Sequence, residues 1–307
     1  NRKRMEEACE HQLKRFLRPD IKMEATISAM GKAHERAPEH RSILPNVKHI
    51  IAVASGKGGV GKSTVASNLA AGLAMQGFKV GMVDADIYGP SVPAMFDVAM
   101  EKPSTIEVDG KEYIKPIESY GVKMLSIGFF STPDQAVVWR GPMATKALTQ
   151  LFKDAYWGEL DFMVIDLPPG TGDVHLTMVQ QVPLTGAIVV STPQEIALVD
   201  VRKALGMFSL PEINVPVLGL VENMAYFTPP ELPENKYYIF GEGGAKELAE
   251  RMDINYLAEI PIVQSIREAG DAGRPAVLQE TTPQAIAFRD LATKVAEKVG
   301  LTVPKSV

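Results

Sequence analysis

The sequence predicts an α/β protein in which helices cover both faces of a mainly parallel sheet. From residue 48 onward, short runs rich in Val and Ile alternate with helical patterns. Strands that are apolar along their whole length are buried on both faces, which is typical of parallel sheets joined by helices. A glycine-rich stretch, SGKGGVGKST, lies between the first run and the first helix. We therefore expect a three-layer fold with a sheet of about seven or eight strands.

The individual elements follow from periodicity. Apolar runs predict strands over residues 49–54, 79–83, 122–127, 162–165, 187–190, 215–221 and 256–260. Helical spacing predicts helices over residues 62–76, 143–156, 173–181, 195–208, 245–252 and 283–299. Asp109 and Gly110 lie between two short extended runs, and this dipeptide is a strong hairpin signal. We expect the hairpin to be an insertion after the second strand–helix unit.

The first 46 residues follow a different pattern. Apolar residues predict one helix over residues 3–18 and one strand over residues 21–27, and residues 31–46 are polar with prolines. One helix and one strand bury too little surface to fold alone. We expect residues 1–30 to be the C-terminal remnant of a small α+β domain, or a decoration on the main domain. Residues 31–46 are then a linker, and residues 47–307 form the main domain.

Composition excludes several classes of function. The 32 basic and 37 acidic residues give a net charge of -5, which argues against a nucleic-acid partner. No apolar run reaches the roughly 18 residues that a membrane helix needs, so we expect no membrane partner. The single cysteine, Cys9, allows no internal disulfide, as is usual in a reducing compartment. These features favour a cytoplasmic protein.

The glycine-rich stretch contains G-x-x-x-x-G-K-S in the strand–loop–helix context of a P-loop. Its backbone N–H groups turn toward phosphate oxygens, and the helix N-terminus adds its dipole. Lys62 is expected to act in catalysis at the β- and γ-phosphates, and Ser63 to bind Mg²⁺. The expected nucleotide-binding residues of this stretch are Gly56, Lys57, Gly58, Gly59, Val60, Gly61, Lys62, Ser63 and Thr64.

Three aspartates follow predicted strands, at the sheet edge where ligands bind. Asp84 and Asp86 end the run VDAD, and Asp166 ends the run DFMVID. We expect Asp166 and Asp84 to lie in the Mg²⁺ shell and Asp86 to position the attacking water. The alternative for Asp84 and Asp86 is that they cap the following turn.

The base is expected to be adenine. The end of the predicted strand 215–221 is followed by VENM and not by the N/T-K-x-D motif of GTPases. Asn223 offers an amide that both donates and accepts hydrogen bonds, which suits the adenine edge. Pro261, after the predicted strand 256–260, is expected to place the loop that covers the base. ATP with Mg²⁺ is therefore the expected ligand.

Several stretches together resemble one family. DADIYGPSVP, VVWRGPM, DFMVIDLPPGTGDVHLT, YYIFGEGGA and SIREAGDAGRPAV are similar to the Mrp/ApbC-type P-loop ATPases, the iron–sulfur cluster carrier proteins. The resemblance covers about residues 45–300 and includes Lys57, the second lysine of the deviant Walker A motif that MinD-like and ParA-like ATPases share. In that group this lysine reaches the partner's nucleotide, so the resemblance implies a homodimer and a catalytic role for Lys57. It also implies slow ATP hydrolysis, and iron–sulfur client or scaffold proteins as partners.

The chain departs from this family in one segment. Members carry a Cys-x-x-Cys pair through which two subunits hold a 4Fe–4S cluster. Here residues 228–237 read TPPELPENKY, without cysteine. Glu231 and Glu234 are hard oxygen ligands that replace thiolates poorly. The cluster is thus implied by resemblance alone, the sequence identifies no Fe–S ligand, and Cys9 is left as an open alternative.

The sequence therefore favours an ATP-hydrolysing homodimer that serves iron–sulfur cluster assembly or transfer. One alternative is a MinD- or ParA-like positioning ATPase, although the end KVGLTVPKSV lacks a basic amphipathic helix. The other is a regulator without a metal cluster that retains only nucleotide binding. The presence of Lys62, Asp86 and Asp166 argues against that regulator.

Overall fold

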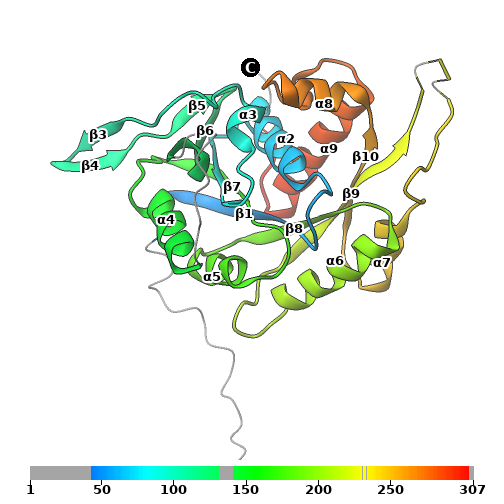
Figure 1. Ribbon diagram of the computed structural model, residues 1–307, viewed down its shortest axis with the longest axis horizontal. Helices are drawn as coiled ribbons and strands as arrows, with labels where there is room; N and C mark the ends of the chain where they lie inside the picture. The colour runs from blue at the N-terminus through cyan, green and yellow to red at the C-terminus, as the bar shows by residue number, and fades with distance from the viewer. Residues whose placement is uncertain (1–42, 131–140, 230, 233, 304–307) are drawn as a thin grey trace, which may run out of the picture. The chain divides into compact units, whose positions relative to one another are not determined.

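The computed structural model describes residues 43–130, 141–229, 231–232 and 234–303 (Figure 1). The expectations for Cys9, for residues 1–30 and for most of the linker lie outside these residues. Within them, one sheet of eight strands has the order β10-β9-β8-β1-β7-β2-β6-β5. Its strands are β1 (Val47–Ser55), β2 (Val80–Asp84), β5 (Ile117–Ser119), β6 (Val122–Ser126), β7 (Leu160–Asp166), β8 (Gly186–Ser191), β9 (Val217–Phe227) and β10 (Tyr256–Ile262). All neighbours run parallel except β5, which is antiparallel to β6. The predicted fold class is confirmed.

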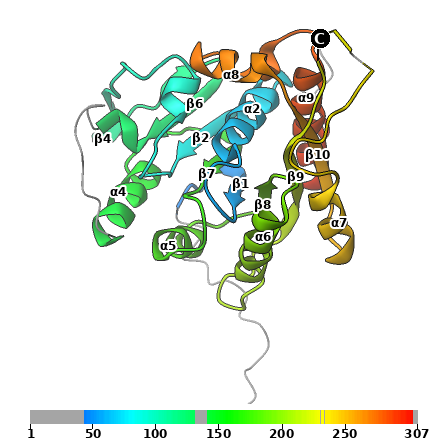
Figure 2. The ribbon, with the colours of Figure 1, turned by 45° about the vertical axis from the view of Figure 1, so that its right-hand side comes forward.

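Helices form a layer on each face of the sheet (Figure 2). One buried cluster joins the sheet to α4 (Gly141–Lys153), α5 (Asp173–Gln181), α6 (Glu195–Phe208) and α7 (Gly244–Arg251). The other joins it to α2 (Lys62–Met75), α3 (Val92–Met95), η3 (Ala276–Leu278) and α9 (Pro283–Lys298), and α8 (Gln264–Asp271) packs at its margin. A short turn, η2 (Ile127–Phe130), follows β6. Because both faces are covered, the central strands are buried along their length, which explains their continuous apolar runs.

The strand register brings two of the predicted site residues, Asp84 and Asp166, to the same edge of the sheet. Val53 of β1 and Asp84 of β2 both pair with Asp166 of β7. The carboxyl ends of these three strands therefore end at one level, directly below the loop that leads into α2. This is the edge at which open parallel sheets bind ligands.

The predicted hairpin insertion is confirmed. β3 (Thr105–Val108) pairs antiparallel with β4 (Lys111–Ile114) and projects from the sheet (Figure 1). Asp109 and Gly110 both have positive φ, 53° and 74°, which a tight hairpin turn of this kind requires.

Three features differ from the predicted elements. β9 continues to Phe227, well beyond the expected end at residue 221, so Asn223 lies inside the strand. Pro261 is likewise inside β10 and not in a loop after it. The edge strand β5 and helix α8 were not predicted, because β5 has three residues and α8 contains no fully buried side chain. Short or exposed elements leave little periodic signal.

No helix in the described part of the chain is long and apolar enough to cross a membrane.

Candidate functional site

The predicted phosphate loop connects β1 to α2. Gly59 and Gly61 adopt left-handed φ values of 81° and 79°, which only glycine adopts without strain. The Ser55 hydroxyl donates to the carbonyl oxygen of Lys57 at 2.9 Å and closes the start of the loop. Gly56 packs so closely on α6 that a Cβ there would lie 2.3 Å from the carbonyl carbon of Asp200. The loop is therefore fixed by its own glycines and by a neighbouring helix.

Lys62 is the electrostatic centre of the site. Its Nζ lies 2.5 Å from Oδ1 of Asp166, 3.6 Å from Oδ2 of Asp86 and 3.3 Å from Oγ of Ser63. Lys62 is 6% exposed and Asp166 is fully buried. Burial raises the pKa of Asp166, and the ammonium of Lys62 opposes that shift. The structure thus brings together four of the residues predicted to act on phosphate and Mg²⁺.

The donors around Asp166 fit a divalent cation. Oδ2 of Asp166 is buried and has no hydrogen-bond partner among the described residues. An orphaned buried carboxylate oxygen is costly unless something binds it. Carboxylate and hydroxyl oxygens are the ligands that Mg²⁺ takes in nucleotide sites, usually with several waters retained. Asp166 and Ser63 are therefore the residues that would hold Mg²⁺ here.

Asp84 is engaged by the chain itself. Its Oδ2 accepts hydrogen bonds from the hydroxyl of Ser126 at 3.0 Å and from the backbone N–H of Val92 at 3.2 Å. Its Oδ1 accepts from the N–H of Asp86 at 3.2 Å. Burial, with the nearby charge of Asp166, raises the pKa of Asp84 to about 7. Asp84 caps the turn that leads to α3, which is the alternative weighed above, and its place in the Mg²⁺ shell stays a prediction.

The loop after β7 is tied to the phosphate loop. The N–H of Gly170 donates to the carbonyl oxygen of Ser55 at 3.0 Å, and Pro169 lines the small cavity that the phosphate loop encloses, called the phosphate cavity below. On its other side, Nδ1 of His175 lies 3.2 Å from the carbonyl oxygen of Pro168. Burial lowers the pKa of His175 to about 4. The imidazole is therefore neutral at physiological pH and positions the loop, as expected of a structural histidine.

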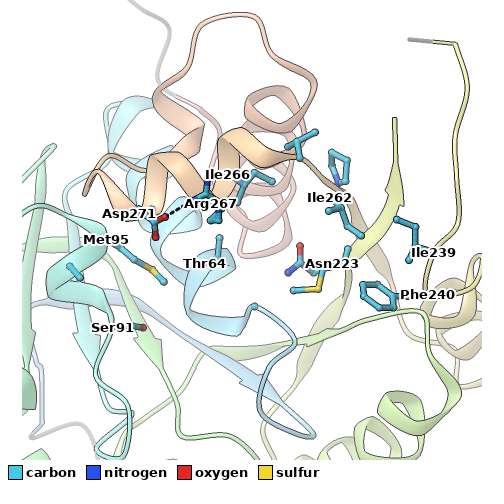
Figure 3. Close-up of a pocket in the computed structure, with 16 residues that line it drawn as sticks. Thr64, Ser91, Met95, Asn223, Ile239, Phe240, Ile262, Ile266, Arg267 and Asp271 are labelled. Atoms are coloured by element: carbon cyan, nitrogen blue, oxygen red, sulfur yellow. Dashed lines mark hydrogen bonds and ion pairs between the residues drawn. The ribbon is translucent and has the colours of Figure 1, made fainter. Parts of the chain in front are cut away.

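Two cavities meet at the phosphate loop. The smaller, of about 240 Å³, is lined by the loop together with Asp86 and Pro169. The larger, of about 880 Å³, extends toward α8 and shares Gly61, Thr64, Ser91 and Met95 with the first. Figure 3 shows its walls, in which Asn223 and Phe240 lie opposite α8. A small polar cavity joined to a larger apolar one has the form of a triphosphate site with a base site.

Asn223 and Pro261 both line the larger cavity. Asn223 is 7% exposed, and its Nδ2 donates to the carbonyl oxygen of Val60 at 2.8 Å. The amide predicted to read the base thus also contacts the phosphate loop. Lys57 lines the smaller cavity, and its ammonium has no ion-pair partner in the part of the chain that the structure describes.

Two walls of the larger cavity, called the base cavity below, were not predicted from the sequence. Ile239 and Phe240, from the stretch YYIFGEGGA, line one side of it, and Ile266 and Gly270 of α8, from the stretch SIREAGD, line the opposite side. Arg267, on the α8 side, pairs with Asp271 at 2.8 Å. Those stretches carried the family resemblance, which was the available signal, but no local pattern assigns them a role.

The described residues of the segment 228–237 belong to a hairpin closed by Phe227 and Tyr237. The backbone groups of Phe227 and Tyr237 exchange two hydrogen bonds of 2.8 Å. Glu231 is exposed. Among the described residues no three His, Cys, Asp or Glu side chains are grouped to hold a metal ion. The residues of this hairpin do not fit a thiolate-bound iron–sulfur cluster.

Comparison with known proteins assigns the chain to a family. Residues 46–296 match the family described as ParA: NUBPL iron-transfer P-loop NTPase. The chain belongs to this NUBPL iron-transfer family. An iron–sulfur cluster carrier protein of Aquifex aeolicus is 51% identical over 261 residues, which cover 84% of this chain and 70% of the relative. The iron–sulfur cluster transfer protein NUBPL of Dictyostelium discoideum is 46% identical over 271 residues, 88% of this chain and 82% of the relative. The predicted family is confirmed.

Solved structures agree with this assignment. A nucleotide-binding protein of Archaeoglobus fulgidus, solved in complex with ADP, is 39% identical with a TM-score of 0.69, over 81% of this chain and 95% of that one. The cell division ATPase MinD of Pyrococcus furiosus is 23% identical with a TM-score of 0.56, over 81% and 98% of the two chains. The second likeness shows the fold alone, so the NUBPL assignment rests on the closer relatives.

Proposed function

We propose that this chain binds ATP with Mg²⁺ and hydrolyses it slowly, as a homodimer that serves iron–sulfur cluster assembly or transfer in the cytoplasm. The observation that carries the proposal is the contact of Lys62 with Asp166 at 2.5 Å beside an unpartnered carboxylate oxygen. The Archaeoglobus relative with ADP and the carrier relatives support it. The single cysteine in the sequence supports the location.

In the proposed mechanism, Lys62 neutralises charge on the β- and γ-phosphates during in-line attack by water. Asp86 positions that water, from a carboxylate already 3.6 Å from Nζ of Lys62. Ser63 and Asp166 would hold Mg²⁺, which would supply further neutralisation of phosphate charge. Before nucleotide binds, Lys62 is paired with Asp166, so binding must exchange one partner of the lysine for another.

Lys57 is proposed to act on the nucleotide of the partner subunit. Its side chain lines the phosphate cavity and lacks an ion-pair partner within the described residues, so it is available to a second chain. A cation supplied across an interface stabilises the transition state of phosphoryl transfer in the manner of an arginine finger. The dimer would therefore be the active form.

A subunit-mixing experiment tests both proposals. Lys62→Ala removes the lysine from its own site, whereas Lys57→Ala removes the lysine offered to the partner. Each variant alone should lose most ATP hydrolysis. Mixed in equal amounts, they should regain part of it, because the intact Lys62 site of one subunit receives Lys57 from the other. Unchanged hydrolysis in Lys62→Ala would refute the site, and absence of rescue would refute action in trans.

In this proposal the iron–sulfur cluster is cargo and not a resident cofactor of the chain. Because the hairpin at residues 228–237 has no thiolate, we propose that the chain supports assembly or transfer through nucleotide-dependent contact with cluster-bearing client or scaffold proteins. The positioning-ATPase alternative has only the fold likeness to MinD in its favour.

A further inference from the structure

Asn223 makes a contact that recognition of a base does not require. Its Nδ2 donates to the carbonyl oxygen of Val60, 163 positions earlier in the chain. Gly61 lies against the same amide, because a Cβ at Gly61 would be 2.2 Å from Nδ2. Only the NH₂ group can donate to a carbonyl, so this bond fixes which way the amide faces. Figure 3 shows its oxygen turned toward the cavity.

The backbone of β9 is irregular at this point. Met224, next in the chain, has a φ of 56°, a left-handed value that is uncommon for a residue with a side chain. The pairing with β10 also shifts: Ile260 pairs with Asn223, but Ile262 pairs with Phe227. Bulges of this kind re-aim side chains next to active sites, and strained residues persist where the surroundings hold them. The irregularity accounts for an amide aimed at the phosphate loop from the middle of a strand.

The contact controls the direction of a phosphate-binding group. In a planar trans peptide, the carbonyl of Val60 and the N–H of Gly61 point in opposite directions. Holding the carbonyl on Asn223 therefore turns the Gly61 N–H away from Asn223. Gly61 lines both the phosphate cavity and the base cavity. The orientation of this one peptide thus depends on a side chain of the base cavity.

We propose that Asn223 is a positioning residue that holds the phosphate loop in its binding shape before nucleotide arrives, while the oxygen of the same amide faces the base. The inference rests on the proposed function of the loop as a nucleotide site. It extends that function, because base recognition and phosphate binding then share one side chain. Loss of the amide should therefore lower the affinity even for ligands that have no base.

Tripolyphosphate provides the test, since it carries the phosphates without base or ribose. Its affinity is measured by displacement of a fluorescent ATP analogue from the full chain. In Asn223→Ala the affinity for tripolyphosphate should fall by about tenfold, the effect of one buried hydrogen bond lost. Phe240→Ala is the matched control, because the Phe240 side chain lines the base cavity and cannot hydrogen-bond to the loop. This variant should lower the affinity for ATP but not the affinity for tripolyphosphate.

Three results would overturn the inference. They are unchanged tripolyphosphate affinity in Asn223→Ala, an equal loss in Phe240→Ala, and failure of the wild type to bind tripolyphosphate while it binds ATP. Thermal unfolding of each variant shows that it is folded. Asn223→Leu, which removes the donor at similar volume without adding a charge, gives the same readout if the alanine variant does not fold. Lys62→Ala separates the two proposals, because unchanged ATP binding and hydrolysis there would refute the nucleotide site itself.

Discussion

Gly56 gives the sharpest test of how the phosphate loop is held. Alanine at this position would put its Cβ 2.3 Å from the carbonyl carbon of Asp200 and 2.6 Å from the backbone nitrogen of Val201. Carbon atoms pack at about 3.5 Å or more, so loop and helix must separate by roughly 1 Å. The obstructing atoms are backbone atoms of α6, which cannot rotate away. We therefore expect Gly56→Ala to lower the free energy of unfolding by about 3 kcal/mol, the upper end of the range for overpacking.

This cost is measurable as a change in unfolding temperature. For a domain of this size, about 3 kcal/mol lowers the midpoint by about 6 to 12 °C. Gly58→Ala is the matched control, because a Cβ there meets no atom within 4 Å. It should change the free energy of unfolding by less than about 0.5 kcal/mol. Both variants are compared by differential scanning calorimetry without nucleotide. Equal midpoints for the two variants would refute the packing argument.

Two further predictions concern pH. The buried His175 has a pKa of about 4, whereas the unfolded residue titrates near 6.5, so the unfolded chain binds more protons between these values and stability falls as pH falls through this window. His175→Asn keeps a donor for the carbonyl of Pro168. Between pH 7 and pH 4 its free energy of unfolding should fall by about 3 kcal/mol less than that of the wild type. Parallel plots of unfolding free energy against pH for the two proteins would contradict this. Burial also raises the pKa of Glu222, so its contribution is present at low pH and is lost as pH rises through the raised pKa. Glu222→Gln, which still accepts from Ala245, should therefore stabilise the chain more at pH 8 than at pH 4 in urea unfolding, and the opposite order would be inconsistent with a buried carboxylate.

Much of the fold was readable from the sequence because its signals are local. The apolar runs predicted seven of the eight sheet strands, and the spacing of SGKGGVGKST predicted the loop that the structure forms between β1 and α2. Asp109 and Gly110 predicted the hairpin for the same reason. Each of these features is decided by residues only a few positions apart.

The rest depends on contacts between distant parts of the chain. Nothing near Asn223 in the sequence indicates that its amide meets Val60. The polar Glu222 and Asn223 interrupt the apolar run, so the strand looked shorter than it is. Helix α8 forms a wall of the base cavity although none of its side chains is fully buried. Such features are set by tertiary packing, which overrides local propensity.

The chain keeps the residues of its family's P-loop, while its hairpin lacks the ligands for a cluster. The most direct measurement is iron and sulfide per dimer after anaerobic reconstitution of wild type and of a Thr228→Cys/Glu231→Cys variant, which places a Cys-x-x-Cys pair in the hairpin. We expect no stable cluster in wild type and about four iron atoms per dimer in the variant, since four thiolates are the usual ligand set of a 4Fe–4S cluster. A wild-type chain that retains a stoichiometric cluster would contradict the account, and its loss in Cys9→Ser would assign the ligand to that thiol.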